Sequence, residues 1–417
     1  MRLINGIPVS LVAALLAGTA VAADLTAIIP SGPDGEALAG AAKRYEEATG
    51  KTVEIVTAPY DNVLDKVVSA CTAKTSAYDV VLIDDPWFPL LSGGNCLEPL
   101  TEHFKAAGIS GPDADFVPNT VKLCQEPYAQ GPYYCLPYTG NAQLFFYNPS
   151  MLADAGFTKP LETWDDVLAG ATAVTEAGNG RTFGFVLRGI QGHPISDAFL
   201  PIFWSFGGQI FDANNHATVN SPEGVKALEF FLKLRDVSPP GISGFDSEEL
   251  QNYMTTRKAA AAVFWPIFIS RFEDPNASNV VGQVKYSAMP SETVTGKSMI
   301  GNWLVGISSE SKNKDLAYDF IAFASSAEQM KIAAEHGNSP VRVSTFEDEE
   351  LVADPRFRHF PVLLEALDNS EPRPRQPRWP EIVQALGTEL SAALTSAKTP
   401  QQALDDANTA IDAIVAR

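Results

Sequence analysis

The chain has 417 residues, of which 45% are hydrophobic, and a formal net charge of −20. This length exceeds the roughly 50–250 residues of a typical domain, so we expect two lobes, each with its own hydrophobic core. The charge disfavours nucleic acids and anionic lipid surfaces, which need a basic face, but it does not exclude an anionic small ligand held by local arginines.

The first 22 residues have the pattern of a secretory signal peptide. Arg2 precedes an apolar run at residues 9–17, and Ala20-Val21-Ala22 forms a small-residue cleavage site. The run is shorter than the roughly 20 residues that span a bilayer, and no cysteine follows the cleavage point to carry a lipid. We therefore expect a soluble exported protein whose mature form begins near Ala23; a buried N-terminal strand is the alternative.

Strands and helices alternate after the signal peptide. We expect strands at residues 25–29, 53–56 and 79–83, with a helix ending at Gly50 and another at residues 62–71 between them. This βαβαβ order predicts parallel strands, whose carboxyl ends form the edge where ligands bind in open sheets. Ser31, Asp34, Tyr60, Asp84 and Trp87 would lie at that edge.

Further helices have recognisable starts. Thr163 with Asp166 approximates a capping box, and Ser221 followed by a proline is typical of an N-cap. We expect one long amphipathic helix at residues 311–330 and a last helix from Thr399 to the end of the chain.

The four cysteines, Cys71, Cys96, Cys124 and Cys135, all lie in the first third of the chain. An even number in an exported protein favours disulfides, and we expect Cys71–Cys96 with Cys124–Cys135 among the three pairings. Zinc is the alternative, but no two cysteines have the CxxC spacing and no histidine lies nearby in a ligand pattern.

The segment YCLPYTGNAQLFFYNPSMLADAGFTKPLETWDD contains a strand at residues 144–147, a short helix ending at Gly156 and a helix opening at Thr163. Five more regions of the chain contain recognisable motifs, here in chain order: DVVLIDDPWFPLLSGGNCLEPL, SFGGQIFDANNHATVNSPEGVKALEFFLKL, AAAAVFWPIF, GNWLVGISSESKNKDLAYDFIAFASSAEQM, and RPRQPRWPEIVQAL with TPQQALDDANTAIDAI. Together they resemble family 1 extracellular solute-binding proteins, the maltose-binding-protein-like sugar receptors of bacterial ABC importers. The resemblance covers almost the whole mature chain.

The resemblance implies an α/β, two-lobed periplasmic binding protein fold of type II-like topology, each lobe a sheet flanked by helices. The N-lobe would combine residues 23–136 and 303–345, and the C-lobe residues 137–302 and 346–417. Three crossings, near residues 137–141, 300–303 and 345–354, would form the hinge. It also implies a monomeric periplasmic receptor that captures a carbohydrate or polyol and delivers it to an ABC permease.

A sugar site needs aromatic platforms for apolar C–H faces and planar polar groups for hydroxyls. At the positions where the family delivers them, Trp265 and Trp303 are the best platforms. Tyr60, Trp87, Trp204 and Trp379 are weaker candidates, since tryptophans are often simply part of a core.

Asp84, Asp85, Asn141 and Asn302 are candidates for binding hydroxyls, with Ser31 and Asp34 in the first turn. For Asp84 or Asp85 the alternative role is a helix N-cap. Arg342 and Arg375 are the arginines we expect near the cleft, the latter from a proline-rich segment that also holds Arg373 and Arg378. An inward arginine would favour an anionic sugar derivative, such as a sugar acid or sulfonate, although a neutral ligand is favoured.

Catalysis finds little support. The sequence has no GxSxG, Walker or GxGxxG motif, its five histidines are dispersed without HExxH, and no DxDxDG calcium loop occurs. We expect no enzyme activity, no cofactor and no metal. An exported carbohydrate-active enzyme is the rival class, because accidental carboxylate pairs are common among fifty acids, and an adhesion or scaffold module is a third.

Overall fold

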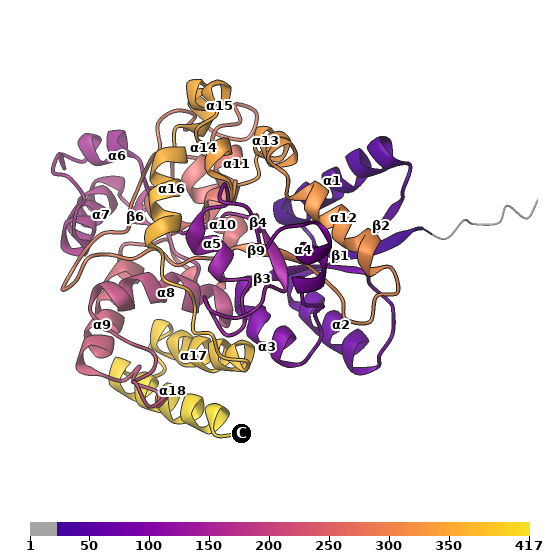
Figure 1. The fold of residues 1–417 in the computed structure, drawn as a ribbon. Helices are drawn as coiled ribbons and strands as arrows, with labels where there is room; N and C mark the ends of the chain where they lie inside the picture. Colours follow the sequence, from indigo (N-terminus) through magenta and orange to yellow (C-terminus); the bar gives the residue numbers. More distant parts are fainter. Residues whose placement is uncertain (1–22) are drawn as a thin grey trace, which may run out of the picture.

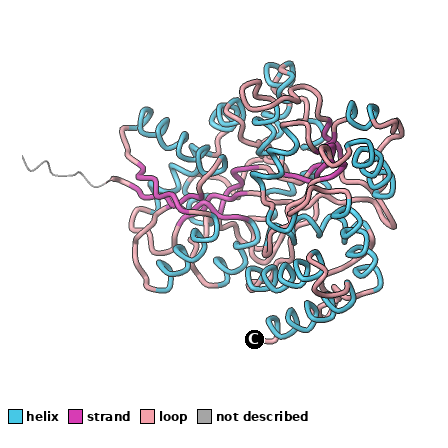
Figure 2. The backbone as a smooth tube through the Cα atoms, turned by 180° about the vertical axis from the view of Figure 1, so that it is seen from behind, coloured by secondary structure: helices cyan, strands magenta, loops and turns pink. Residues whose placement is uncertain are grey.

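The computed structural model describes residues 23–417, so the predicted signal peptide at residues 1–22 lies outside the described part. Two separate β-sheets run through the middle of the molecule, and helices cover them on the outside (Figures 1 and 2). This arrangement confirms the predicted α/β class. From residue 23 onward, no helix is both long enough and apolar enough to cross a membrane.

The first sheet has five strands in the order β2-β1-β3-β9-β4. Its strands are β1 (Leu25–Pro30), β2 (Val53–Ala58), β3 (Val80–Asp84), β4 (Cys135–Thr139) and β9 (Trp303–Ile307). β1 is parallel to β2 and β3, as predicted, with α1 (Pro33–Thr49) and α2 (Tyr60–Thr72) as the crossovers. β9 runs antiparallel between β3 and β4.

The second sheet has four strands in the order β6-β7-β5-β8. They are β5 (Leu144–Tyr147), β6 (Phe183–Phe185), β7 (Ala259–Phe264) and β8 (Lys285–Ser287). Around it lie α6 (Pro149–Asp154), α7 (Trp164–Gly178), α8 (His193–Ser205), α9 (Pro222–Asp236), α10 (Ser247–Thr255) and α11 (Ile269–Phe272). β7 is buried along its whole length, which explains its continuous apolar sequence AAAAVF.

Shorter elements and the C-terminal helices complete the fold. These are η1 (Asp85–Trp87), α3 (Phe88–Gly93), α4 (Thr101–Ala106), α5 (Pro118–Lys122), η2 (Ile242–Gly244), η3 (Pro266–Phe268), α12 (Lys314–Ala324), α13 (Ala327–Glu335), α14 (Val343–Phe346), α15 (Glu349–Ala353), η4 (Pro355–Phe357), α16 (Phe360–Asn369), α17 (Trp379–Leu394) and α18 (Pro400–Val415). α17 packs against both α8 and α18, and α17 and α18 are the yellow pair in Figure 1.

The chain passes between the sheets more than once. It leaves the first sheet after β4, enters the second at β5, and returns to the first between β8 and β9. The lobes are therefore interleaved in sequence. The residue boundaries expected for each lobe, and the third crossing, remain predictions.

Helix starts follow the predicted chemistry. Thr163 and Thr399 each form a complete capping box, and the Ser221 side chain accepts a hydrogen bond from the amide of Gly224. The single helix expected at residues 311–330 is wrong: the structure has α12 and α13 instead. Ser326 ends the continuity because its side chain caps α13 by accepting from the Gln329 amide.

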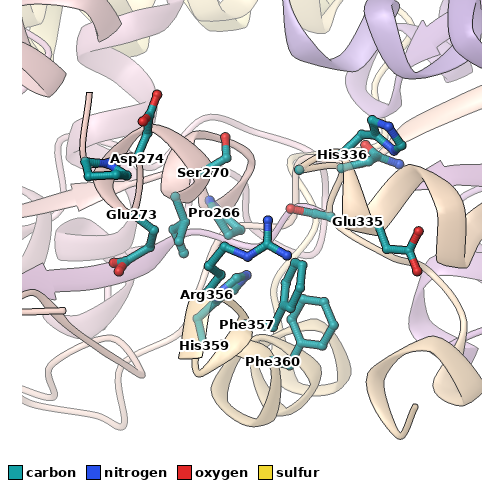
Figure 3. A pocket seen from close by; sticks show the side chains of 15 residues that line it. Pro266, Ser270, Glu273, Asp274, Glu335, His336, Arg356, Phe357, His359 and Phe360 are labelled. Atoms are coloured by element: carbon teal, nitrogen blue, oxygen red, sulfur yellow. The ribbon is translucent and has the colours of Figure 1, made fainter. Parts of the chain in front are cut away.

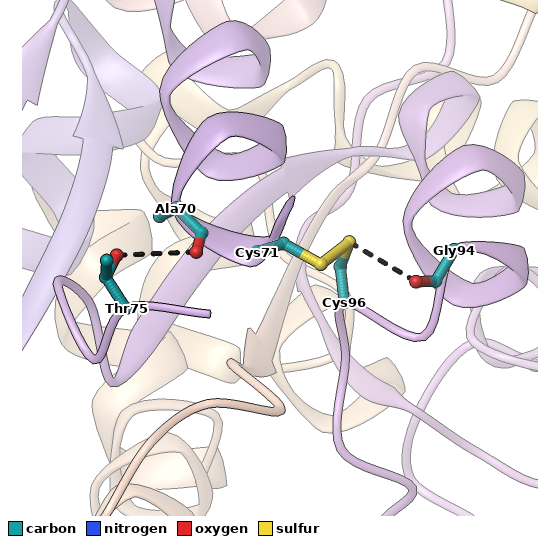
Figure 4. The surroundings of a disulfide bond; sticks show 5 residues. All are labelled: Ala70, Cys71, Thr75, Gly94 and Cys96. Carbon is teal, nitrogen blue, oxygen red and sulfur yellow. Dashed lines mark hydrogen bonds between the residues drawn. A yellow bond between two sulfur atoms is a disulfide. The ribbon is translucent and has the colours of Figure 1, made fainter. Parts of the chain in front are cut away.

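One predicted disulfide is present. Cys71, in the last turn of α2, is bonded to Cys96 in the segment after α3 (Figure 4). The other expected bond is not formed, because Cys124 and Cys135 are both buried free thiols. Burial and the neighbouring Cys124 thiol raise the pKa of Cys135, which disfavours the reactive thiolate.

Candidate functional site

A cavity of about 300 Å³ lies between elements of the two sheets. One wall comes from the loops and helix starts around the five-stranded sheet: Ser31, Asp34, Tyr60, Asp84 and Trp303. The facing wall comes from elements around the four-stranded sheet: Arg188, His193, Asp197, Asp246, Ser247, Trp265, Ile267 and Phe268. Asn141 and Gly301, in the segments between the sheets, and Arg373 also line the cavity.

The sheet topology explains why distant residues meet here. β1, β2 and β3 are parallel neighbours, so the residues that follow them gather at one edge. Ser31 follows β1, Tyr60 follows β2 after the single residue Pro59, and Asp84 ends β3. Trp265 follows β7 in the other sheet and reaches the same cavity.

Aromatic rings form much of the wall. The ring of Tyr60 lies 5.9 Å from that of Trp303 and 4.8 Å from those of both Trp87 and His193. The Tyr60–His193 contact joins the two walls directly. Such rings offer flat apolar surfaces on which the C–H face of a ligand can stack.

The position of the Trp265 ring depends on the absence of a side chain at Gly301. A Cβ atom at Gly301 would lie 2.4 Å from the Trp265 ring, so only glycine allows this approach. The indole is partly exposed and lines the cavity.

Asp34 and Asn141 link the two walls. The Asn141 amide nitrogen lies 3.5 Å from an Asp34 oxygen, and its carbonyl oxygen accepts from the Ile267 amide at 3.2 Å. Burial and the charge of Asp84 raise the pKa of Asp34 to about 7, although a hydrogen bond from Trp303 opposes the rise.

Arg373 lies at the centre of a second cluster of polar side chains. Its guanidinium donates to Asp84 at 3.0 Å and to Asp85 at 2.6 Å, and it is only 4% exposed. The Tyr60 hydroxyl donates to the other Asp84 oxygen at 2.6 Å. Burial, assisted by the charge of Asp84, raises the pKa of Asp85 to about 6 despite the two nearby arginines.

A third cluster of polar side chains lies on the facing wall. The Arg188 Nε donates to Asp246 at 2.7 Å, and its Nη1 lies 3.6 Å from an Asp197 oxygen. His193 Nδ1 lies 3.5 Å from the same Asp197 oxygen. Burial alone would raise the pKa of Asp197, but the hydrogen bond from His193 and the charges of Arg373, His193 and Arg188 lower it.

The cavity continues into an adjoining space of about 450 Å³. Tyr60, His193, Asp197, Asp246 and Arg373 line both spaces. The predicted candidates Trp87 and Trp379 line this second part, although Trp379 is 2% exposed and serves mainly as core.

The structure thus brings Ser31, Asp34, Tyr60, Asp84, Asn141, Trp265 and Trp303 to the cavity, and Trp87 and Trp379 to its extension. Asp85 and Asn302 lie behind the wall, both fully buried, with the Asp85 amide donating to the Asn302 carbonyl at 3.0 Å. Trp204 is a buried residue of α8 and does not line the cavity.

Two predicted arginines have structural partners outside the cavity. Arg342 pairs with Asp113 and Asp115 and lies 3.8 Å above the centre of the Phe116 ring. Arg375 donates to the backbone carbonyls of Asp85 and Leu123. Neither guanidinium is placed to contact a ligand in the cavity.

Several lining residues were not predicted: Arg188, His193, Asp197, Asp246, Ser247, Ile267, Phe268 and Arg373. The spacing of His193 and Asp197, four residues apart at the start of a helix, was a usable signal for a polar pair. Arg188 and Asp246 meet from segments far apart in sequence, and no local pattern announces their pairing.

Another cavity, of about 320 Å³, lies outside this cleft. Glu273 and Asp274 border it on one side and Glu335 and His336 on the other, with Arg356 between them (Figure 3). Two of its charged groups already have protein partners: Arg358 and Tyr286 donate to Glu273, and Arg356 pairs with Asp354. None of the predicted site residues lines it.

The fold and the cleft define a two-lobed binding protein. Residues 29–331 match the family model described as bacterial extracellular solute-binding protein, and the chain belongs to this family. The protein is therefore a solute-binding protein and not an enzyme.

Individual relatives are moderately similar. A probable amino-acid ABC transporter periplasmic-binding protein of Sinorhizobium fredii is 27% identical, with 94% of this chain and 89% of the relative covered. A mannitol-binding protein of Pseudomonas aeruginosa is 28% identical over 69% of this chain and 70% of its own. Among solved structures, an ABC transporter solute-binding protein of Agrobacterium radiobacter K84 in complex with ribitol is 27% identical, with a TM-score of 0.86 and coverage of 93% and 98%.

Proposed function

We propose that this protein is the periplasmic receptor of an ABC importer and binds a carbohydrate or polyol in the cavity between its two sheets. The observation that carries the proposal is the combination of aromatic rings and carboxylates in one small cavity. Trp265 and Trp303 supply apolar faces, and Asp34, Asp84 and Asp197 supply hydroxyl acceptors. The mannitol-binding relative and the ribitol complex support the same ligand class.

The size of the cavity favours a small ligand. Its volume of about 300 Å³ is at the lower end of the range for small-molecule sites. The adjoining space of about 450 Å³ gives room for part of a longer ligand.

Charge distinguishes the main alternatives. A sugar acid, a sulfonate or the carboxylate of an amino acid would need a free guanidinium. Arg373 is already paired with Asp84 and Asp85, and Arg188 with Asp246 and Asp197. A ligand without a negative charge is therefore favoured, and an anionic sugar derivative is not.

The working cycle follows from the position of the cavity. Ligand contacts with both walls favour a closed arrangement over an open one, and the closed form would be accepted by the permease. We further propose a monomer, with the lobes divided at the predicted crossings and the signal peptide removed between Ala22 and Ala23.

The proposal is tested by thermal unfolding of the mature protein, freed of ligand, against monosaccharides, disaccharides, polyols, sugar acids and amino acids. A ligand at 100 times its Kd should stabilise the folded state by about 2.7 kcal/mol. We expect stabilisation by at least one sugar or polyol without turnover. Stabilisation by a sugar acid alone, or by an amino acid alone, would contradict the proposed ligand class.

A further inference from the structure

The charges that line the cavity do not balance. Four carboxylates line it, those of Asp34, Asp84, Asp197 and Asp246, against the two guanidinium groups of Arg188 and Arg373. Arg373 pairs with Asp84 and with the buried Asp85, and Arg188 pairs with Asp197 and Asp246. Each guanidinium is therefore shared between two carboxylates. The remaining charge of the cavity is negative.

Asp34 is the carboxylate whose charge is left without a cation. Its hydrogen-bond partners are neutral: the Asn141 amide at 3.5 Å and Trp303. The influences that raise its pKa to about 7 are burial and the nearby charge of Asp84, and no cation among residues 23–417 counters them. Its side chain is partly exposed, so a ligand atom can approach it.

Asp197 provides a second, independent indication. It is 3% exposed and lines the cavity, yet its Oδ1 accepts no hydrogen bond. A buried carboxylate oxygen without a donor costs free energy that a donor-rich ligand can recover. Among the residues that line the cavity, carboxylates therefore outnumber guanidinium groups, and one carboxylate oxygen accepts no hydrogen bond.

We propose that the ligand is a polyhydroxylated molecule that carries a protonated amine, an amino sugar or amino polyol, with its ammonium group at Asp34. An ammonium group has three donors and no acceptor, which matches an unpaired carboxylate. Its hydroxyls would be bound by the other carboxylates, and the aromatic rings of the same cavity add attraction for a cation. This inference rests on the proposed carbohydrate or polyol binding and specifies the ligand within that class.

The test compares ligands that differ at one group. Titration calorimetry at pH 7 would measure Kd for glucitol, its amine glucamine and its acid gluconate, and for glucose, glucosamine and glucuronate. We expect an amine to bind about tenfold or more tightly than its neutral counterpart in at least one series, with the acid weakest.

Two variants locate the effect. Asp34→Asn removes the charge without changing the side-chain shape, and we expect the affinity ratio of amine to neutral ligand to fall towards one. Glu36→Gln removes a charge from the same turn of α1 but lies outside the cavity, so the ratio should stay as in the natural protein. Near-ultraviolet circular dichroism of both variants would verify that they are folded.

Contrary outcomes are distinguishable. If both neutral ligands bind as tightly as their amines or more tightly, the inference is overturned while carbohydrate binding stands. An unchanged ratio in Asp34→Asn overturns the assignment of the ammonium to Asp34. Failure of both series and of the whole sugar and polyol panel overturns the proposed function together with this inference.

Discussion

Asp34 illustrates how a cavity changes the chemistry of one residue. It lies in the first turn of α1, where an acidic side chain is normally stabilised by the helix dipole. Burial and the charge of Asp84 nevertheless raise its pKa to about 7. The folded protein therefore favours the protonated form of Asp34 more than the unfolded chain does.

This shift of the Asp34 pKa predicts that its contribution to the free energy of unfolding depends on pH. A carboxyl group whose pKa is higher in the folded state than its unfolded value of roughly 3.9 contributes most to the stability of the folded state below a pH of roughly 3.9. This contribution is lost as the pH rises through 7. Asp34→Asn should therefore increase the free energy of unfolding at pH 8 by on the order of 1 kcal/mol, a value discounted for the solvent that reaches the side chain.

Urea unfolding at pH 4, 6 and 8 would measure the effect, with Glu36→Gln reporting the loss of an acidic group from the same turn. A gain that is as large at pH 4 as at pH 8 would show that ionisation of Asp34 is not the cause.

Arg373 shows the opposite case, a buried cation whose partners depend on it. Arg373→Ala would leave the carboxylates of Asp84 and Asp85 buried without their guanidinium. We expect a loss of about 3–5 kcal/mol in unfolding free energy. The matched control is Arg378→Ala, because Arg378 is 39% exposed and, among residues 23–417, forms an ion pair only with Glu381; it should lose less than about 1 kcal/mol. Equal losses in denaturant unfolding would contradict this role.

The sequence could not distinguish these arginines. Arg373, Arg375 and Arg378 share one irregular proline-rich segment, where no helical or strand period fixes the direction of a side chain. Arg373 enters the cavity, whereas Arg375 turns to the carbonyls of Asp85 and Leu123. The choice depends on acceptors more than 200 residues away in the chain, since the separations are 288 to 290 for the Asp84 and Asp85 contacts and 252 for Leu123.

At the scale of elements, local chemistry was a good guide. The first three strands and the helices starting at Thr163, Ser221 and Thr399 lie where apolar patterns and capping residues predict them. The break between α12 and α13 was missed because the apolar spacing continues across Ser325 and Ser326. The Ser326 side chain, which caps α13, marks the break.

The Cys71–Cys96 disulfide ties α2 to the segment after α3. The two cysteines are 25 residues apart, for which loop-closure entropy gives a stabilisation of about 3 kcal/mol. Cys71→Ser/Cys96→Ser should lower the urea midpoint accordingly. Dithiothreitol should have the same effect on the natural protein and none on the double variant; sensitivity of the double variant to the reductant would point to another disulfide.

The approach of Trp265 to Gly301 brings the second sheet's wall against the crossing segment. Gly301→Ala places a methyl group where the indole lies, so the ring must move. We expect ligand affinity to fall at least about tenfold because the aromatic platform is displaced. Gly244→Ala is the control, since no atom lies within 4 Å of its added Cβ. Calorimetric titration that finds equal affinities for the two variants would contradict the platform role.

At the scale of the whole molecule, the cavity exists only because residues from elements around both sheets come together to line it. The resemblance to solute-binding proteins anticipated the fold and brought Trp265 and Trp303 together as candidates, although 38 residues separate them and no local rule relates them. It could not provide Arg188, Asp197 or Asp246. Their placement depends on how α8 and α10 pack in this particular chain.

The interleaved order of the two lobes along the chain is also compatible with a rotation that closes the cavity. β4 and β9 are neighbours in one sheet and lie beside the segments that lead to and from the other, so a few residues between elements can absorb a rotation. Contacts such as Tyr60 with His193 then bring the two walls together.

The central claim is that this cavity binds a polyhydroxylated ligand between its aromatic walls. The most direct measurement is calorimetric titration of the ligand-free mature protein and of Trp265→Ala with the strongest ligand of the sugar and polyol panel. We predict saturation at one ligand per chain and an affinity at least about tenfold lower in the variant. Absence of saturable binding, or equal affinity in both proteins, would contradict the account.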